Sequence, residues 1–127
     1  MNASDLMYTD SHEWIDLSGP VAKVGITDHA QQLMGDIVFV ELPEVGAEIA
    51  KGDEILTIES PKAAASVYAP VSGKIAAIND RLESAPEVIN QSPYEEGWIV
   101  QIEPSNLEAE KDGLMDADAY EKKVSDE

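Results

Sequence analysis

Short apolar runs, separated by glycine and proline, make up most of the chain. Runs of this length with turn residues at nearly regular intervals are typical of an all-β sandwich or barrel. We therefore expect a mainly β fold, with strands at residues 13–17, 21–25, 37–42, 55–59, 66–69, 74–79 and 98–102. The sequence Ser18-Gly19-Pro20 predicts a hairpin between the first two strands, and its proline indicates a sheet edge.

One short helix is expected near residues 27–34, between two of these strands. Thr27 is a suitable N-cap, and Gly35 is placed to end the helix about two turns later. The residues predicted to share its apolar face are Ile26, Ala30, Leu33 and Met34.

The C-terminal part of the chain, about residues 105–124, predicts a helical tail packed on the core. Ser105 and Glu108 have the spacing of a capping box, Gly113 breaks the run, and Asp116 can cap a second segment. At the two ends, residues 2–6 and 125–127 are expected to fray.

A chain of 127 residues is long enough for one compact domain and short for two. We expect a single domain over residues 1–127, with its core at about residues 7–103. The longest run of large apolar residues, 37–40, is far shorter than the roughly 18 to 20 residues that cross a bilayer. No membrane span is predicted.

Charge and cysteine content exclude several functions. Twenty-six acidic residues against eight basic ones give a net charge of −18, which disfavours nucleic acid and anionic membranes as partners. Mutual repulsion also favours a monomer. The chain has no cysteine, so it has no disulfide and no thiol nucleophile. Its first residues resemble neither a secretory signal nor a mitochondrial presequence, and a cytoplasmic location is expected.

The sequence contains no recognisable active site of its own. His12 and His29 are the only histidines, and without cysteine their spacing does not predict a metal site. Phosphate-binding loops and nucleophile elbows are absent from the sequence. We therefore expect a protein that is not an enzyme.

One lysine stands out, in the segment Ser60-Pro61-Lys62-Ala63-Ala64-Ala65 between two predicted strands. Proline restricts its own φ and favours an extended residue before it, so the approach to Lys62 is rigid. The alanines leave no bulky side chain beside the amine. This is what a modifying enzyme or a tethered prosthetic group requires, although an exposed turn lysine without a role has the same pattern.

The segment from Ile58 to Ala64 resembles the lipoyl-lysine hairpin of the glycine cleavage system H-protein family, and the likeness covers about residues 7 to 124. Further segments resemble the family in the same order. They are residues 12–14 (HEW), 24–31 (VGITDHAQ), 33–43 (LMGDIVFVELP), 69–73 (APVSG), 93–98 (PYEEGW) and 119–121 (AYE). The resemblance implies a lipoyl/biotinyl-type β sandwich, a barrel-sandwich hybrid, with the modified lysine at a hairpin tip.

The resemblance also implies a function. Lipoic acid would be joined by an amide bond to Lys62, and the protein would carry an aminomethyl group from the glycine decarboxylase (P protein) to the aminomethyltransferase (T protein). The dithiol would then pass to the dihydrolipoamide dehydrogenase (L protein). A lipoate ligase or a lipoyl or octanoyl transferase would attach the cofactor.

Site residues follow from the same resemblance. Glu59 and Gly73 match positions that lipoylating enzymes recognise, and Ser11, Glu13 and Ser66 are candidates for a cleft that holds the loaded arm.

Two residues depart from the family pattern, because Pro61 replaces a common valine and Ser66 a common acid. The second change keeps open an alternative function, an H-like lipoyl carrier or relay that serves lipoate transfer to other enzymes. A biotin carrier, which typically has methionine on both sides of its lysine, and a plain interaction module are less favoured.

Overall fold

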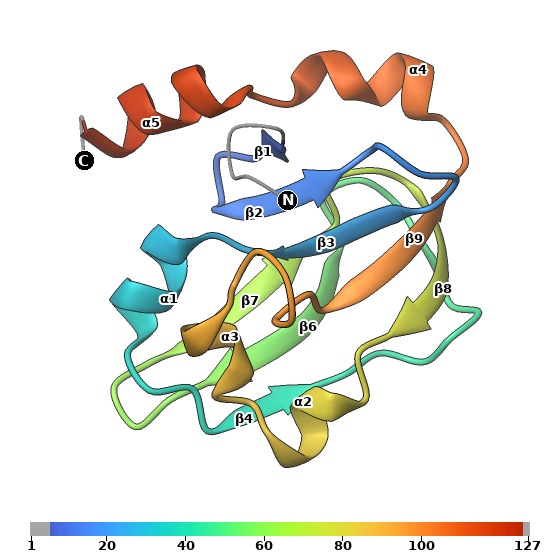
Figure 1. The fold of residues 1–127 in the computed structure, drawn as a ribbon. Helices are drawn as coiled ribbons and strands as arrows, with labels where there is room; N and C mark the ends of the chain where they lie inside the picture. The colour runs from blue at the N-terminus through green and yellow to red at the C-terminus, as the bar shows by residue number, and fades with distance from the viewer. Residues whose placement is uncertain (1–5, 126–127) are drawn as a thin grey trace.

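The structure, a computed structural model, describes residues 6–125, which form two antiparallel sheets and several short helices (Figure 1). The larger sheet has the order β1-β2-β3-β9-β8-β5, and the smaller has the order β4-β6-β7. The strands of the larger sheet are β1 (Met7–Tyr8), β2 (Glu13–Asp16), β3 (Ala22–Ile26), β5 (Glu48–Ile49), β8 (Gly73–Ile78) and β9 (Val100–Pro104). Those of the smaller sheet are β4 (Phe39–Glu41), β6 (Glu54–Glu59) and β7 (Ala64–Tyr68).

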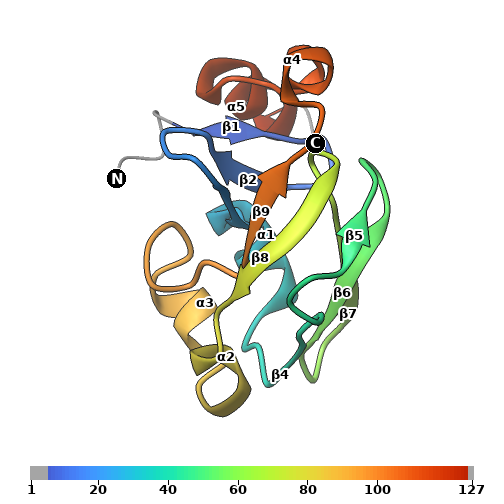
Figure 2. The ribbon, with the colours of Figure 1, turned by 90° about the vertical axis from the view of Figure 1, so that its right-hand side faces the viewer.

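The main core lies between the two sheets, which are seen from the side in Figure 2. Strand β6 shows how the alternation of residues builds it. Leu56 and Ile58 are buried, whereas the intervening Thr57 is half-buried and Glu59 is exposed. A second cluster of buried residues lies beneath the C-terminal helix and consists of Leu6, Tyr8, Trp14 and Tyr120. The mainly β fold is therefore confirmed.

Each expected strand has a counterpart within two residues or so of its predicted ends, and the hairpin between β2 and β3 is present. The edge assigned to Pro20 is wrong, because β1 pairs with the outer side of β2, and β9 pairs with β3. Strands β1 and β5 were not expected, since two residues are too few to show a period. No helix of the described residues is long and apolar enough to cross a membrane.

The predicted short helix is α1 (Asp28–Met34). The Ala30 amide donates to Thr27 Oγ1 at 3.2 Å, and Gly35 ends the helix with a φ of 78°. The four residues predicted to share its apolar face line one cavity, but to different depths: Met34 is buried in the core, whereas Leu33 is 55% exposed.

The C-terminal tail contains α4 (Leu107–Glu110), a 3₁₀ turn (Lys111–Gly113) and α5 (Ala117–Ser125), and both views place α4 and α5 over β1 (Figures 1 and 2). Asp116 caps α5, with the Ala119 amide donating to its Oδ1 at 2.8 Å. The prediction of a capping box between Ser105 and Glu108 is wrong, because Asn106 is the N-cap of α4 and its side chain makes no capping hydrogen bond.

Two helices of four residues each, α2 (Arg81–Ser84) and α3 (Val88–Gln91), were not expected. The predicted fraying is wrong for Leu6, whose side chain is only 1% exposed, and Ser125 is the last residue of α5. The other residues of that prediction, 2–5 and 126–127, lie outside the described part of the chain.

Candidate functional site

Lys62 lies at the exposed tip of the hairpin formed by β6 and β7, which projects beside α1 (Figure 1, lower left). Glu59 and Ala64 are the last paired residues of the two strands. Beyond them the Ser60 amide donates to the Ala63 carbonyl at 2.8 Å, which leaves Pro61 and Lys62 as a two-residue turn. The amine therefore stands on a short, closed turn among exposed alanines, as the sequence predicted.

Ser60 ties this tip to α1. Its hydroxyl donates to the Met34 carbonyl at 2.6 Å and accepts the Ala63 amide at 3.0 Å. The Lys62 side chain also runs close to the end of α1, since its Cδ would lie 3.9 Å from a Cβ on Gly35. One side chain thus fixes the turn and the angle at which the hairpin leaves the body of the protein.

A Ser60→Ala variant will lose the hydrogen bonds of this hydroxyl to the Met34 carbonyl and to the backbone of Ala63. We expect the free energy of unfolding to fall by about 1–2 kcal/mol, and the Ala63 amide to exchange with solvent faster than in the wild type. Chemical denaturation and amide hydrogen exchange measure the two effects. Ser60→Thr keeps a hydroxyl and serves as the control; equal exchange at Ala63 in all three proteins would show that the tie has no effect on the tip.

A cavity of about 230 Å³ lies between the hairpin, α1 and the loop before β2. Its walls are mostly apolar, from Ile26, Ala30, Leu33, Met34, Ile58, Val67 and the alanines 63–65. Its polar groups come from Ser11, His12, Glu13 and Ser66. The three predicted cleft residues, Ser11, Glu13 and Ser66, thus line one cavity that begins at the residue after Lys62.

Glu13 is the buried acid of this cavity, with a side chain that is 1% exposed. The hydroxyls of Thr9 and Ser11 both donate to its Oε1 at 2.5 Å, and the Tyr68 amide donates to its Oε2 at 3.2 Å. Burial raises the pKa of the Glu13 carboxyl above its usual value, and these three donors offset only part of that rise. Among residues 6–125 no lysine or arginine forms an ion pair with it. The carboxylate is therefore held in place by neutral donors and can receive a cation from outside the chain.

Ser66 donates from its hydroxyl to Glu54 Oε1, on the neighbouring strand, at 2.7 Å. A carboxylate thus lies within hydrogen-bonding distance of the position where the family commonly has an acid. The serine alone carries no charge, but together with Glu54 it keeps a negative group on the hairpin.

The two positions predicted for lipoylation recognition are separated by the structure. Glu59 is exposed at the end of β6, next to the turn. Gly73 is buried at the start of β8, which follows the five-residue strand β7 and the connecting residues 69–72. Glu59 therefore adjoins Lys62 at the tip, whereas Gly73 lies in the sheet on the other side of the core.

Several parts of the site were missed by sequence reasoning. The Tyr68 amide is a backbone group, so no residue type signals it. Thr9 had a weak signal, since a hydroxyl stands four residues before an acid, in a segment just before the first predicted strand. For Ser60 only an extended backbone before Pro61 was predicted, and the hydrogen bonds of its hydroxyl were not.

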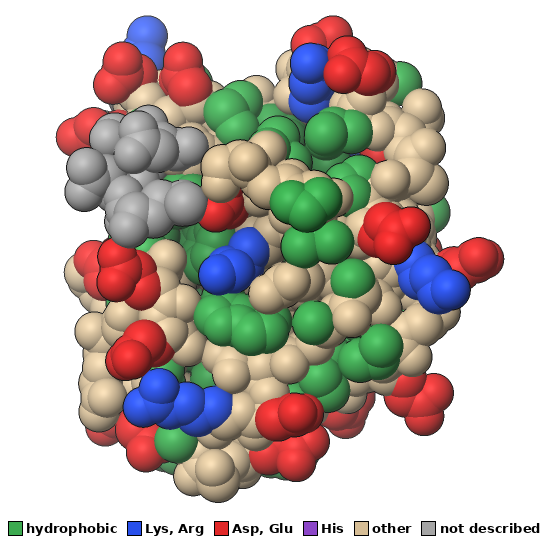
Figure 3. Space-filling model, turned by 45° about the vertical axis from the view of Figure 1, so that its right-hand side comes forward, with side chains coloured by type: hydrophobic (Ala, Val, Ile, Leu, Met, Phe, Trp, Pro, Cys, Tyr) green, Lys and Arg blue, Asp and Glu red, His purple; other side chains and the backbone are tan. Residues whose placement is uncertain are grey.

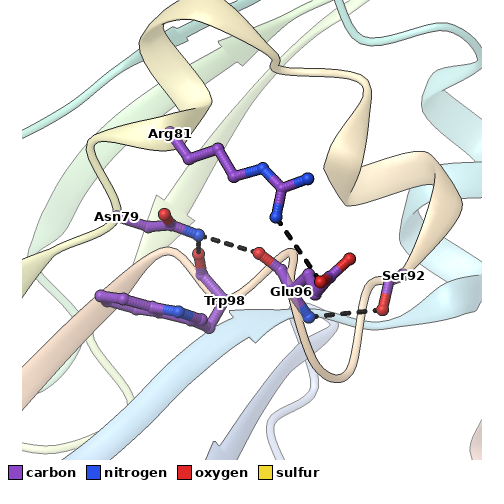
Figure 4. Close-up of polar contacts among 5 residues, drawn as sticks. All are labelled: Asn79, Arg81, Ser92, Glu96 and Trp98. Atoms are coloured by element: carbon purple, nitrogen blue, oxygen red, sulfur yellow. Dashed lines mark hydrogen bonds and ion pairs between the residues drawn. The ribbon is translucent and has the colours of Figure 1, made fainter.

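A larger hollow of about 460 Å³ lies by Trp98, on another part of the surface. Asn79 Nδ2 donates to the carbonyls of Glu96 and Trp98 at 2.9 and 2.7 Å, and Arg81 is paired with Glu96 at 3.6 Å (Figure 4). These contacts hold the loop before β9, so the polar groups there serve the fold.

The acidic composition of the chain is visible on its surface. On the face shown in Figure 3, acidic side chains are spread over the surface with hydrophobic side chains between them. Among the described residues no group of three or more histidines and carboxylates could hold a metal ion.

Comparisons with known proteins give one consistent result. A family model described as "Glycine cleavage H-protein" matches residues 6–127. A protein of Teredinibacter turnerae named "Glycine cleavage system H protein" is 50% identical over 126 residues, which cover 98% of this chain and 95% of that protein. One of Thermotoga maritima with the same name is 52% identical over 114 residues, 90% of this chain and 91% of that protein.

A solved structure is also similar. The crystal structure of a glycine cleavage system H protein from Mycobacterium marinum matches with a TM-score of 0.85 and 33% sequence identity. The match covers 96% of this chain and 98% of that one. Both the sequence and the arrangement of the two sheets are therefore shared over nearly the whole chain.

Proposed function

This chain belongs to the glycine cleavage H-protein family, and from that membership we propose that it is the lipoyl-bearing shuttle of the glycine cleavage system. Members of this family are carrier subunits. The chain would take an aminomethyl group from the glycine decarboxylase to the aminomethyltransferase, and its dithiol to the dihydrolipoamide dehydrogenase. It would catalyse none of these steps itself. The observation that carries the proposal is the exposed Lys62 on a closed turn beside a cavity that contains a buried carboxylate.

The residues at the tip suit a lipoyl group amide-linked to the Lys62 Nζ. The neighbouring side chains are alanines, which allow both a modifying enzyme and the attached arm to approach. When attached, the group would supply a disulfide able to accept the aminomethyl carbon together with the electron pair left when glycine loses CO2. The apolar walls that start at Ala63 suit an aliphatic arm.

Glu13 and Ser11 are proposed to hold the charged end of the loaded arm. An aminomethyl group ends in an amine that is a cation when protonated, and a carboxylate fixed by neutral donors is a suitable partner for it. Leu33, although partly exposed, contributes with Met34 to the apolar wall that limits access of water. The cavity would thus slow the hydrolysis of the cargo between enzymes.

The relay function is the less favoured alternative. Its basis in the sequence was the absence of an acid at position 66, and Glu54 lies 2.7 Å from the Ser66 hydroxyl. The named relatives cited above are all glycine cleavage system H proteins.

The proposal extends to the partners, the oligomeric state and the location of the protein. The net charge of −18 favours encounter with basic patches on the partner enzymes and repulsion between copies. We propose a monomer in the cytoplasm, modified by a lipoate ligase or by a lipoyl or octanoyl transferase that contacts Glu59 near the tip.

The test is glycine-dependent exchange of labelled bicarbonate in the presence of the decarboxylase. The protein lipoylated in vitro should support exchange, and the same preparation before lipoylation should not. Lipoylated protein that supports no exchange, but donates its lipoyl group to other apo-domains, would instead establish the relay function.

A further inference from the structure

The loop that carries Ser11 and Glu13 has an unusual backbone. The His12 amide donates to the Thr9 carbonyl at 3.2 Å, and the Thr9 amide donates to the Glu13 carbonyl at 3.0 Å. This pattern is the three-residue hairpin loop that needs a left-handed residue at its end, a position usually occupied by glycine. His12 fills it with a φ of 71° and is the only non-glycine residue with positive φ among residues 6–125.

The His12 side chain is used in a contact with the C-terminal helix. Its Nδ1 lies 2.7 Å from the Tyr120 hydroxyl, which also lies 2.7 Å from Thr27 Oγ1. The rings of His12 and Tyr120 meet edge to face, with centroids 5.7 Å apart. Tyr120 is 7% exposed and stacks on Tyr8 with ring centroids 4.6 Å apart, so its hydroxyl has a fixed position.

The backbone of His12 is also hydrogen-bonded to Thr27, the residue whose side chain contacts the Tyr120 hydroxyl. The Thr27 amide donates to the His12 carbonyl at 3.0 Å, and Thr27 caps α1, which forms a wall of the cavity. Glu13 is the next residue along the chain. A shift of the loop would therefore move its carboxylate and the end of α1 together.

We propose that His12 and Tyr120 are positioning residues for the loaded arm, because their hydrogen bond fixes the loop that places Ser11 and Glu13 in the cavity. This inference rests on the proposed function. It makes α5 a part of the arm-binding structure, although none of its residues lines that cavity. The left-handed backbone at His12 is unfavourable for a side chain, and the contact with Tyr120 compensates for it.

Three variants separate positioning from loop building. His12→Gly suits the left-handed backbone better than histidine does but removes the contact with Tyr120. His12→Asn tolerates the same backbone and keeps a polar atom bonded to Cγ, where Nδ1 stands. Tyr120→Phe keeps the stacking on Tyr8 and removes only the hydroxyl.

The first readout uses the protein without its cofactor. Amide hydrogen exchange at Thr9 and Thr27 should be roughly three- to tenfold faster in His12→Gly and Tyr120→Phe than in the wild type, and close to wild type in His12→Asn. The midpoint of thermal unfolding is recorded for each protein, so that a general loss of stability is recognised.

The second readout is the release of ammonia and formaldehyde from the loaded protein in buffer, after removal of the decarboxylase. His12→Gly and Tyr120→Phe should release the cargo roughly three- to tenfold faster than the wild type. Glu13→Gln, which removes the carboxylate proposed to hold the arm, should also release it faster and serves as the reference. His12→Asn should restore most of the protection.

The outcomes distinguish the two proposals. If the wild type cannot be loaded, the proposed function fails. If the wild type is loaded and Glu13→Gln shortens the life of the cargo, but His12→Gly and Tyr120→Phe behave as the wild type in both readouts, only the positioning role is overturned. Glycine at position 12 that matches or exceeds histidine in both readouts would show that the residue merely builds the loop.

Discussion

A Lys62→Arg variant should gain no lipoyl mass when it is produced together with a lipoate ligase, whereas the wild type should gain one lipoyl group. The guanidinium keeps the positive charge and similar reach, but it stays protonated at all accessible pH values and cannot form the amide. Because residue 62 is exposed at a turn, the free energy of unfolding should change by less than about 0.5 kcal/mol. Intact-protein mass spectrometry measures the modification directly.

The matched control is Lys74→Arg, which makes the same change at another exposed lysine. It should be lipoylated as the wild type is, and it should support bicarbonate exchange at the wild-type rate once modified. Lys62→Arg should support none. Lipoylation that persists in Lys62→Arg, or that is lost in Lys74→Arg, would contradict attachment at residue 62.

The hairpin that carries Lys62 could be predicted because its signals are local. Alternating residues in β6, the small residues of the turn and the proline before the lysine all lie within a few positions of one another. Because the turn is short, it also determines which residues pair across the hairpin, and Glu59 pairs with Ala64. For the same reason the cap of α1 at Thr27 and the cap of α5 at Asp116 were predicted correctly.

The environment of Glu13 could be predicted only in part. The resemblance indicated the residue, but an acid at a strand end is ordinarily solvated, and nothing local shows that it is buried. Its burial depends on Tyr68, which is 55 positions away in the sequence and contributes a backbone amide. The link from His12 to Tyr120 spans 108 positions. Such contacts are made by the packing of the two sheets and the tail.

The smallest elements were missed because they have too few residues to form a pattern. Strands β1 and β5 have two residues each, and helices α2 and α3 have four. Their position follows from pairing and packing against larger elements, not from propensity. The capping box at Ser105 failed for a related reason: the Ser105 amide donates to the Ser72 carbonyl at 3.0 Å, which draws this residue toward the sheet and leaves Asn106 at the cap.

Gly73→Ala is expected to destabilise the protein more than it affects recognition by the lipoylating enzyme. A Cβ at this position would overlap the Glu103 carbonyl oxygen and lie 2.8 Å from Ile102 Cγ2, both on β9. Backbone cannot move aside as the end of a flexible side chain can, so the paired strands β8 and β9 must separate. We expect the free energy of unfolding to fall by about 3 kcal/mol and the unfolding midpoint to fall by roughly 10 °C.

Gly19→Ala is the control, because its Cβ would meet nothing closer than 3.9 Å and the residue is exposed. It should unfold within about 0.5 kcal/mol of the wild type. Lipoylation is then compared at a temperature where all three proteins are folded, and Gly73→Ala should be modified at a rate close to that of the wild type. A Gly73→Ala protein that is as stable as the wild type but is not lipoylated would contradict this prediction. It would show that the lipoylating enzyme recognises Gly73 itself, and that the close approach of β8 to β9 does not require glycine for stability.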